Sequence, residues 1–485
     1  MPTLSRILAL TGLFVAGACA LNPVTGRREL SLVPEAQEIA MGREGAAAVA
    51  ASIGLHPDAG LQSWVNGMGQ AIVARSERPN LPWDFKVVDD ASVNAFALPG
   101  GFIFVTRGLL TQMTNEAELA SVLGHEAGHV TARHSVQQMS REQLAGLALG
   151  IGSAISPTIA EYGQLAGAGL GLLFLKYGRD DETQSDQLGF GYALESGYDT
   201  REMISVFRMF QLQSEIGGGG RLPEWQSSHP DPGNRIATVQ RMVAASTANF
   251  GSLRVGQDEF LRRLDGMVYG EDPRLGFFVG PLFVHPDLAF TVRFPTGWKT
   301  RNANDAVTAV STEQDAMIQL RGAQGSAVQA AQAFFAQQGM TAGAQSRGTV
   351  HGNAVIRGEF AAKAEGGAEV RGVAAFLEYG GATWSITAYT AAARFANYTS
   401  AFDRTIASFA QLRDAAALAA QPHQVRIVAA PRAMTLTQFN AAQPSSISIA
   451  ELAMINGMDA QASLRAGQLV KRVVGTPLPR TVTAP

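Results

Sequence analysis

Apolar residues recur at helical spacing over most of residues 34–246, which predicts a largely α-helical region. One interruption, at residues 85–106, has the character of strands. Within it, two extended runs at residues 93–98 and 102–106 flank a Pro-Gly-Gly sequence, which is typical of a turn. The pattern therefore predicts a mainly helical domain with a small β-hairpin.

Helical signals resume after this hairpin at Asn115. Glu118 follows three residues later, a spacing typical of a capping box at a helix start. The apolar periodicity then continues through the sequence GHEAGHV at residues 124–130. We expect both histidines of this sequence, His125 and His129, to lie on a regular helix.

The most apolar stretch beyond the N-terminus spans residues 144–175. Pro157, Glu161 and Gln164 divide it into two pieces, each shorter than the roughly 20 apolar residues that a membrane-spanning helix needs. A membrane segment is the alternative, but we expect a buried or cleft-lining helical hairpin. The Gly-rich sequence at residues 217–220 predicts a loop, and a further helix is expected at residues 234–245.

The pattern changes to alternation over residues 280–412, with helical segments at 326–339 and 395–409. This predicts a separate α+β domain. An Ala-rich linker at 413–424 leads to a small unit at 425–475, and we expect the Pro-rich tail at 476–485 to be disordered.

Composition bounds the class of protein. The chain has 485 residues, of which 46% are hydrophobic and 16% charged, so we expect roughly two to four globular domains. The formal net charge of -3 provides none of the basic surface that nucleic-acid binding requires, so we exclude nucleic acid as a partner.

The first 19 residues have the pattern of a secretory signal peptide, with one basic residue, an apolar run and small residues before Cys19. Cys19 is the only cysteine, so no internal disulfide can form. Its position resembles a bacterial lipobox, which implies a lipid-modified cysteine and, because no aspartate follows, the outer membrane. An ordinary signal peptide that is cleaved near this cysteine is the alternative.

The sequence HEAGH offers the chemistry of a metal site. Positions four apart on a helix differ by about 40°, so His125 and His129 point the same way and can share one metal ion. Glu126 lies beside them, where its carboxylate can reach a water molecule on that metal without binding the metal itself. A catalytic zinc ion needs a third protein ligand and one open position.

The best candidate for the third ligand lies on a second predicted helix near residues 179–189. Glu182 and Asp186 are four residues apart there, so Glu182 could bind the metal while Asp186 accepts the free N–H of one histidine. The alternative is a solvated acidic helix start.

Five motifs occur in the order seen in peptidase family M48: NPVTGRREL, NAFALPGGFIFVTRGLL, ELASVLGHEAGHVTARH, RDDETQSDQLG and SSHPDPGNRIA. The sequence resembles the exported bacterial branch of this family of zinc metallopeptidases. The resemblance implies one Zn²⁺ per chain with His125, His129 and Glu182 as ligands, Glu126 as general base and Asp186 as their support. Ser185 departs from the alanine that the family usually has before this aspartate.

Other histidines are predicted to have different roles. His134 would face away from the metal on a continuous helix, so we expect a structural role. His229 matches a histidine at the rim of the family's cleft and is expected to act in catalysis or to occupy the open zinc position, with Arg235 holding its loop. A loop histidine before a turn is the alternative. The histidines without a partner pattern are His56, His285, His351 and His423.

Two further resemblances concern the C-terminal half. The sequence FTVRFPTGW at residues 290–298 and the element order resemble the PsbP-like fold. The end of the 425–475 unit resembles a LysM domain, a βααβ unit, although its start lacks the usual Gly-Asp-Thr. The expected architecture is multidomain, with a zincin metallopeptidase domain at 22–250, the PsbP-like domain at 280–412 and the LysM-like unit.

The sequence thus predicts a zinc endopeptidase of the Gram-negative periplasm, anchored to the outer membrane, that acts on unfolded or misassembled envelope proteins. Substrate is expected to lie as an extended strand against Asn94, Ala95 and Phe96, held through backbone hydrogen bonds. Two alternatives are a chaperone-like module with a gated peptidase site and a peptidoglycan-binding protein that uses its LysM-like unit.

Overall fold

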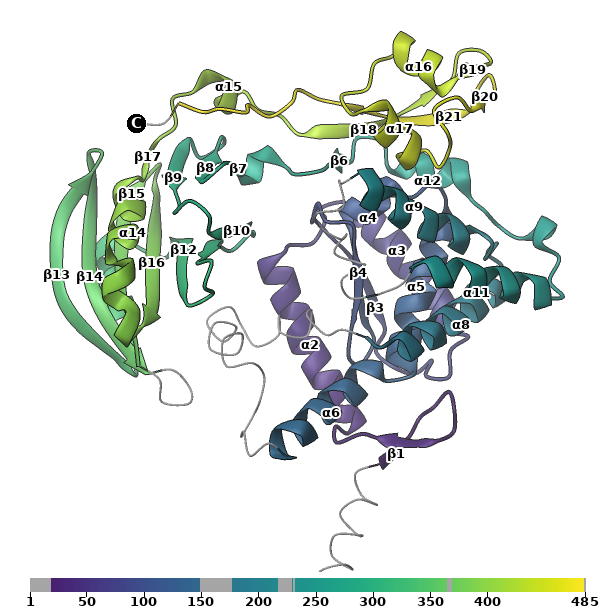
Figure 1. The fold of residues 1–485 in the computed structure, drawn as a ribbon, viewed down its shortest axis with the longest axis horizontal. Helices are drawn as coiled ribbons and strands as arrows, with labels where there is room; N and C mark the ends of the chain where they lie inside the picture. The colour runs from purple at the N-terminus through teal and green to yellow at the C-terminus, as the bar shows by residue number, and fades with distance from the viewer. Residues whose placement is uncertain (1–18, 149–176, 217–228, 230–231, 364–368, 484–485) are drawn as a thin grey trace, which may run out of the picture.

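The computed structural model describes residues 19–148, 177–216, 229, 232–363 and 369–483. Figure 1 shows a helical domain, residues 19–263, beside a β-rich domain, residues 273–412. A C-terminal unit, residues 423–474, lies over the helical domain (Figure 1). The predicted signal peptide up to residue 18, most of the predicted apolar hairpin and the Gly-rich loop at 217–220 lie outside the described residues.

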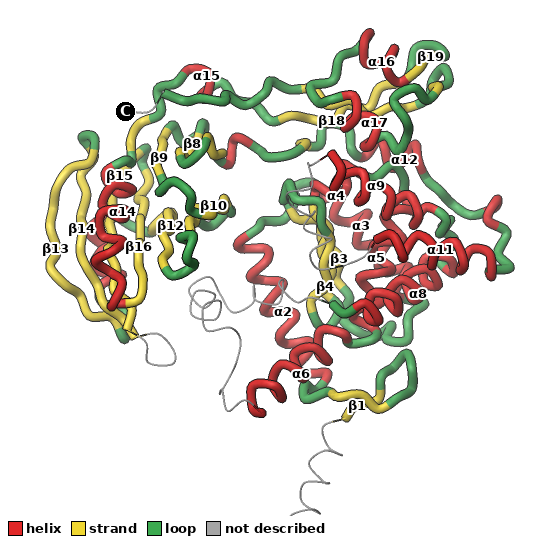
Figure 2. The backbone as a smooth tube through the Cα atoms, viewed as in Figure 1, coloured by secondary structure: helices red, strands yellow, loops and turns green. Residues whose placement is uncertain are grey.

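The helical domain contains two short N-terminal strands, a small sheet and a set of helices around it (Figure 2). Its elements are β1 Cys19–Leu21, β2 Arg28–Leu30, α2 Glu35–Ser52, α3 Ala59–Val73, β3 Asp84–Val88, β4 Ala95–Leu98, β5 Phe102–Thr106, α4 Arg107–Gln112, α5 Glu116–Thr131, α6 His134–Ala148, α8 Arg179–Glu195, α9 Glu202–Ile216, α11 Pro232–Ala245 and α12 Gln257–Arg263.

The predicted hairpin is confirmed, because β4 and β5 pair antiparallel. β3 adds a third strand, parallel to β5, which gives the order β3-β5-β4. Among the described residues, β4 is therefore an edge strand of this sheet.

Helix α5 is the centre of the helical domain. All of its residues are buried, which is expected of a helix that crosses a core. Asn115 caps its N-terminus through a bond from the Glu118 backbone N–H to Oδ1, 2.9 Å. Glu118 does not complete the predicted capping box, because its carboxylate accepts a hydrogen bond from the backbone N–H of Thr114 instead.

The β-rich domain contains one large sheet with the order β10-β11-β12-β16-β15-β14-β13 and a smaller one with the order β17-β9-β8-β7. Its elements are β7 Phe277–Val279, β8 Leu282–His285, β9 Phe290–Arg293, β10 Lys299–Asn302, β11 Val307–Val310, β12 Ala316–Ala323, α13 Ala327–Phe335, β13 Met340–Val350, β14 Asn353–Lys363, β15 Glu369–Tyr379, β16 Ala382–Ala391, α14 Phe395–Ala407 and β17 Ala410–Gln411.

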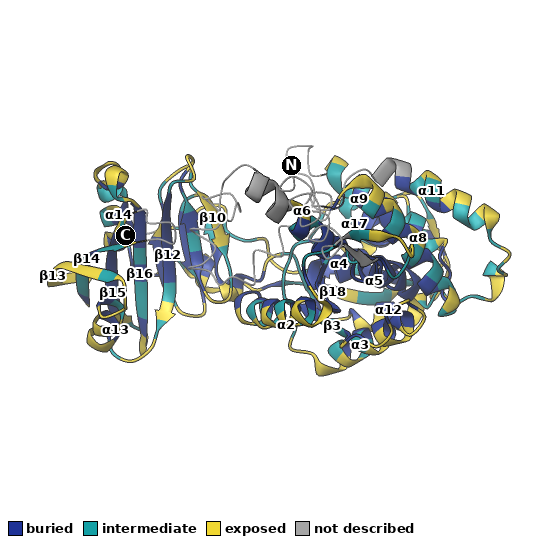
Figure 3. Cartoon of the chain, turned by 90° about the horizontal axis from the view of Figure 1, so that it is seen from below, coloured by how far each residue is buried: buried dark blue, intermediate teal, exposed yellow. Residues whose placement is uncertain are grey.

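The large sheet is covered on both faces, because alternate residues of β15 enter two different cores. Val373 and Ala375 pack in the core with Phe402 of α14. Ala374 and Phe376 pack in the other core, beneath α13. Edge strand β13 is largely exposed (Figure 3).

The C-terminal unit consists of two strands, two helices and two further strands, in that order. Its elements are β18 His423–Ala429, β19 Met434–Thr435, α16 Leu436–Ala442, α17 Ile449–Ile455, β20 Ser463–Leu464 and β21 Leu469–Val474. β18 pairs with β21 on one side and with β6, Val268–Tyr269, on the other. The unit is therefore joined by a sheet to the segment that leaves the helical domain.

A buried lysine fixes the C-terminal unit to the helical domain. Lys471 is fully buried, and its Nζ donates to the carbonyl oxygens of Thr111, Gln112 and Met113 at distances of 2.9, 3.3 and 2.6 Å. These carbonyls lie at the C-terminal end of α4, where a positive charge is favourable. Val425 of β18 also belongs to the main core of the helical domain.

The segments on either side of this unit are ordered as well. The predicted linker contains α15, Ala415–Leu418. In the tail for which the sequence predicts disorder, Leu478 and Val482 pack against a cluster that includes Phe277 and Leu412. In the part of the chain that the structure describes, no helix combines the length and hydropathy that membrane crossing requires.

Candidate metal centre

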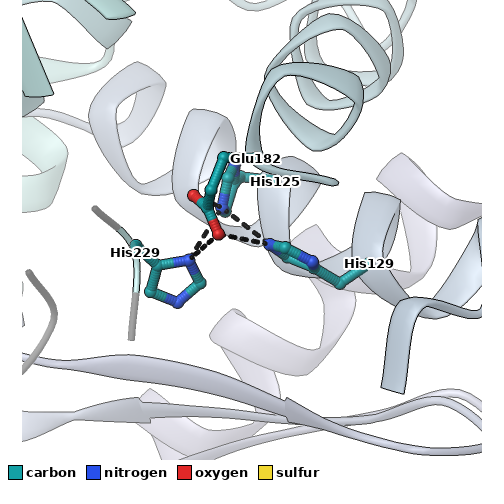
Figure 4. A group of neighbouring side chains, drawn as sticks. All are labelled: His125, His129, Glu182 and His229. Carbon is teal, nitrogen blue, oxygen red and sulfur yellow. Dashed lines mark hydrogen bonds and ion pairs between the residues drawn. The ribbon is translucent and has the colours of Figure 1, made fainter. Parts of the chain in front are cut away.

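Helices α5 and α8 bring the predicted metal ligands together. His125 Nε2 and His129 Nε2 are 3.1 Å apart, and Glu182 of α8 has one carboxylate oxygen 3.5 Å from the first and the other 3.4 Å from the second. With His229, they form a buried group whose ligand atoms all lie within 4.8 Å of one another (Figure 4). This set of imidazoles and a carboxylate is the donor set that zinc prefers.

Glycine allows these two helices to approach this closely. A Cβ on Gly124 would lie 2.8 Å from the carbonyl oxygen of Gly189, and one on Gly128 would lie 3.0 Å from Cα of Ser185. Larger side chains at the two α5 positions would therefore move α8, and Glu182 with it, away from the histidines.

The ring of His125 is oriented by Asp186, as the sequence predicts. Nδ1 of His125 lies 2.9 Å from Asp186 Oδ1, so Nδ1 carries the proton and Nε2 faces the cluster. Arg235 donates to both oxygens of Asp186, at 2.8 and 2.6 Å, and lies 3.0 Å from Glu182 Oε2. Burial opposes ionisation of Asp186, but Arg235 and His125 outweigh it and hold the pKa of Asp186 below its ordinary value.

The charges around the cluster favour a cation at its centre. Burial and Arg235 disfavour a charged His125, yet the hydrogen bonds to Asp186 and Glu182 raise its pKa to about 9. Burial likewise opposes ionisation of Glu182, but the three surrounding histidines hold its pKa well below the ordinary value. A divalent cation supplies the positive charge that these carboxylates favour.

Glu126 lies beside this cluster. It is fully buried, and neither of its carboxylate oxygens has a hydrogen-bond partner among the described residues. The nearest ring nitrogen that the structure records beside it is Nε2 of His229, 3.6 Å from Oε1. Burial raises the pKa of Glu126, partly offset by His229 and His125. A buried carboxylate without a partner is costly unless a ligand or a reaction uses it.

His229 lies inside the cluster and not at its rim. Its Nδ1 is 2.9 Å from Glu182 Oε1 and 3.3 Å from His125 Nε2. The side chain is buried. His229 therefore belongs to the group of residues that could hold a metal ion, and its role stays a prediction.

The prediction of one continuous helix through His134 is wrong. Helix α5 does not continue through it, because Arg133 adopts a left-handed conformation with φ 62° and α6 begins at His134. The turn brings His134 Nδ1 to 3.0 Å from His129 Nδ1. The error came from extending one helical periodicity across a break that no glycine or proline marks.

Tyr177 was missed by the sequence analysis. Its ring stacks on His129 with a centroid distance of 3.7 Å, and its hydroxyl lies 3.0 Å from Ser135 Oγ. Burial raises the pKa of this phenol. No motif spacing would have found it, because Tyr177 follows the long apolar stretch and precedes α8.

The remaining predicted site residues lie outside the cluster. Asn94 precedes β4 and Ala95 and Phe96 open it, and the Asn94 backbone bonds to Thr106 of β5. The side-chain oxygen of Asn94 has no hydrogen-bond partner in the described part of the chain. Cys19 is the first residue of β1, which pairs with β2.

Comparison with known proteins gives a consistent assignment for the helical domain. Residues 60–243 match peptidase family M48. The beta-barrel assembly-enhancing protease of Yersinia pestis is 32% identical over 256 residues, which are 49% of this chain and 52% of the relative. The mitochondrial metalloendopeptidase OMA1 of Bos taurus is 32% identical over 170 residues, 33% of this chain and 32% of the relative. The chain thus spans about half or less of the length of these relatives.

The comparison with solved structures gives weaker matches. Cyanobacterial PsbP of Synechocystis matches with 15% identity and a TM-score of 0.23, covering 28% of this chain and 94% of that chain. The PsbP-like and LysM-like assignments therefore stay predictions from the sequence.

Proposed function

From the peptidase family M48 segment at residues 60–243, we propose that this chain is a zinc-dependent endopeptidase. The observation that carries the proposal is the convergence of His125, His129 and Glu182 beside the Glu126 carboxylate, which has no hydrogen-bond partner among the described residues. Three protein ligands and an adjacent carboxylate are what a hydrolytic zinc site needs. The metalloendopeptidase and protease names of the relatives support the same activity.

Zinc held by His125, His129 and Glu182 would act as a Lewis acid toward the peptide carbonyl and would lower the pKa of water at the site. Glu126 takes the proton of the attacking water and then returns it to the nitrogen of the leaving amine. Burial raises the pKa of Glu126 above its ordinary value, which makes its carboxylate a better proton acceptor. Asp186 and Arg235 hold His125 and Glu182 in place during these transfers.

We also propose that the site is gated by His229. His229 would be a fourth ligand of the metal, and its ring lies between Glu182 and Glu126. Cleavage would then require the His229 side chain to leave this position. The same observation favours the second candidate function, an envelope binding module whose peptidase site is closed at rest.

Substrate binding is proposed at edge strand β4. An extended peptide can add to this edge through backbone hydrogen bonds, with Asn94, Ala95 and Phe96 lining the start of the strand. Such bonds do not depend on the sequence of the peptide, which suits unfolded or misassembled polypeptides. The name of the Yersinia pestis relative, a beta-barrel assembly-enhancing protease, supports substrates among β-barrel proteins during their assembly.

The location, the membrane anchor and the further binding partners of the chain are part of the same proposal. We place the protein in the periplasm of a Gram-negative bacterium, with Cys19 as a lipid anchor in the outer membrane. The C-terminal unit is a candidate for peptidoglycan binding, which a pull-down of the intact chain on insoluble peptidoglycan would test. Nucleic acid is not proposed as a partner, given the net charge of -3.

The test of the main proposal is zinc content and casein cleavage of the purified chain, with Glu126→Gln as the matched variant. We expect about one zinc per chain in both proteins, because Glu126 is not a ligand. Cleavage should fall by roughly 10²- to 10⁴-fold in the variant, which lacks the base. A wild-type chain that holds no zinc would overturn the ligand assignment.

A further inference from the structure

The second metal-facing histidine, His129, is joined to a partner that lies on the next helix. Nδ1 of His129 lies 3.0 Å from Nδ1 of His134, and both residues are buried. We propose that His134, held by Gln184, is a positioning residue that fixes His129 in the tautomer a metal requires. This inference rests on the proposed zinc site.

The contact between the two rings requires one donor and one acceptor. Two imidazole nitrogens at 3.0 Å share a single proton, which either ring can supply. If His129 donates through Nδ1, its Nε2 keeps a lone pair. If it accepts, its Nε2 carries the proton in the neutral ring and cannot bind a metal. The direction of this one hydrogen bond therefore decides whether His129 can be a ligand.

The groups that face Nε2 of His134 set the direction of the hydrogen bond between His129 and His134. Its Nε2 lies 2.9 Å from Gln184 Oε1 and 3.8 Å from Asp181 Oδ1. A carboxylate accepts only, so the environment of Nε2 favours a proton on that nitrogen. The neutral ring of His134 then accepts at Nδ1, and His129 must donate.

The resulting lone pair on His129 points into the cluster. Nε2 of His129 lies 3.1 Å from Nε2 of His125 and 3.4 Å from Glu182 Oε1. The hydroxyl of Ser185 lies 3.4 Å from His134 Nδ1 and can donate to the same acceptor. Ser185, which departs from the alanine usual in the family, thus supports this direction. We call the hydrogen bonds from His129 to His134 and from His134 to Gln184 the relay.

The backbone around Arg133 makes the relay possible. The left-handed conformation of Arg133 ends α5 and starts α6, which turns His134 back toward His129. Arg133 is held there by hydrogen bonds to the Glu38 carboxylate, 2.9 Å, and to the carbonyl oxygen of Val33, 2.8 Å. The two ligand histidines are therefore oriented by different groups: a carboxylate for His125, and an imidazole backed by an amide for His129.

The test measures the zinc dissociation constant by chelator competition and the visible spectrum of the cobalt-substituted chain. Gln184→Glu keeps an acceptor opposite His134, Gln184→Leu removes it and Gln184→Lys places a donor there. We expect near wild-type affinity for Gln184→Glu and an affinity about 10- to 100-fold weaker for Gln184→Lys, with Gln184→Leu between them. The cobalt spectrum of Gln184→Lys should change as its coordination changes.

The control is Thr183→Ala, since Thr183 is the exposed neighbour of Gln184 on α8 and does not contact His134. It should bind zinc as the wild type does. His134→Phe is a second variant, expected to weaken zinc binding by about 10- to 100-fold. If His134→Phe fails to fold, the Gln184 variants still test the proposal, because they change only the group opposite Nε2 of His134.

Three results separate the relay from the proposed function. Equal zinc affinities across the Gln184 series, in a wild-type chain that binds zinc and cleaves casein, would overturn the relay and leave the function intact. Lower stability of the metal-free Gln184→Lys chain without a change in affinity would also overturn it, because this is the result of a purely structural role. A wild-type chain that binds no zinc would overturn both.

Discussion

A Cβ atom on Gly189 would lie 2.5 Å from the backbone nitrogen of His125. That distance is shorter than any unstrained contact, and the atom that it meets is backbone, which cannot rotate away. The position of Glu182 relative to the histidines therefore requires a glycine, which has no Cβ, at residue 189.

We accordingly predict that Gly189→Ala pushes α8 away from α5. The variant should lose about 1–3 kcal/mol of unfolding free energy, typical of overpacking, and should bind zinc more weakly. Gly191→Ala is the control on the same helix, since its Cβ would meet nothing within 4 Å. It should be neutral or up to about 1 kcal/mol more stable, because alanine favours helix. Urea unfolding measures the stability of each variant, and chelator competition measures its zinc affinity. Equal stabilities and equal zinc affinities of the two variants would contradict the close-packing argument.

His229→Ala should increase cleavage if His229 closes the site. We expect casein hydrolysis to rise by roughly tenfold, the effect of removing about 1.4 kcal/mol of stabilisation from a closed state. Zinc content should stay at about one per chain, because three other ligands remain. A fall in the cleavage rate with zinc retained would instead assign His229 to stabilisation of the tetrahedral intermediate.

Asp186→Asn should weaken zinc binding by about 10- to 100-fold, because the orientation of the His125 ring and the charge beside it are lost. Asp180→Asn is a matched control, since Asp180 is exposed in the first turn of the same helix. Chelator competition on both variants checks the prediction. Equal affinities would show that Arg235 alone holds His125 in position.

Glu126 should make the stability of the metal-free chain depend on pH. Because burial raises its pKa, the folded chain keeps the proton at pH values where the unfolded chain has lost it. Its contribution to stability is therefore fully present below the unfolded pKa and is lost as pH rises through the window up to the folded pKa. The slope there is at most about 1.4 kcal/mol per pH unit.

Glu126→Gln removes this dependence. In a chelator, the stability advantage of the variant over the wild type should be smallest below about pH 4 and should grow as pH rises toward neutrality. Urea unfolding of both proteins over this range is the measurement. An advantage that is constant with pH would mean that the Glu126 carboxylate is already solvated in the folded chain.

Lys471→Met should destabilise the junction between the C-terminal unit and the helical domain. The variant leaves the carbonyl oxygens at the end of α4 without their buried donor, at a cost of about 2–5 kcal/mol. Arg465→Met, at an exposed position of the same unit, should cost little. Thermal unfolding compares the two, and a wild-type midpoint for Lys471→Met would show that the unit is held by other contacts.

The local pattern of the sequence predicted what depends on local structure. Asn115 as helix cap, the hairpin of β4 and β5, and the common direction of His125 and His129 follow from residue type and spacing within a few turns. The α8 carboxylates were candidates because their spacing matches one face of a helix, and Glu182 and Asp186 do lie beside these histidines.

The features that were missed depend on conformation or on contacts between distant segments. The return of His134 requires a left-handed Arg133, a conformation that its sequence context does not indicate. The burial of Lys471 could not be predicted from the sequence either, because a lysine among apolar residues at the end of a strand normally reaches solvent. Its partners lie about 360 positions earlier in the chain.

That separation also bears on the order in which the protein matures. The carbonyl oxygens at the end of α4 and the core of the helical domain are completed by Lys471 and Val425. A chain that emerges from its N-terminus presents helix α5 early and these two residues late. The end of α4 and the core of the helical domain therefore receive their last contacts only when the segment from Val425 to Lys471 is available.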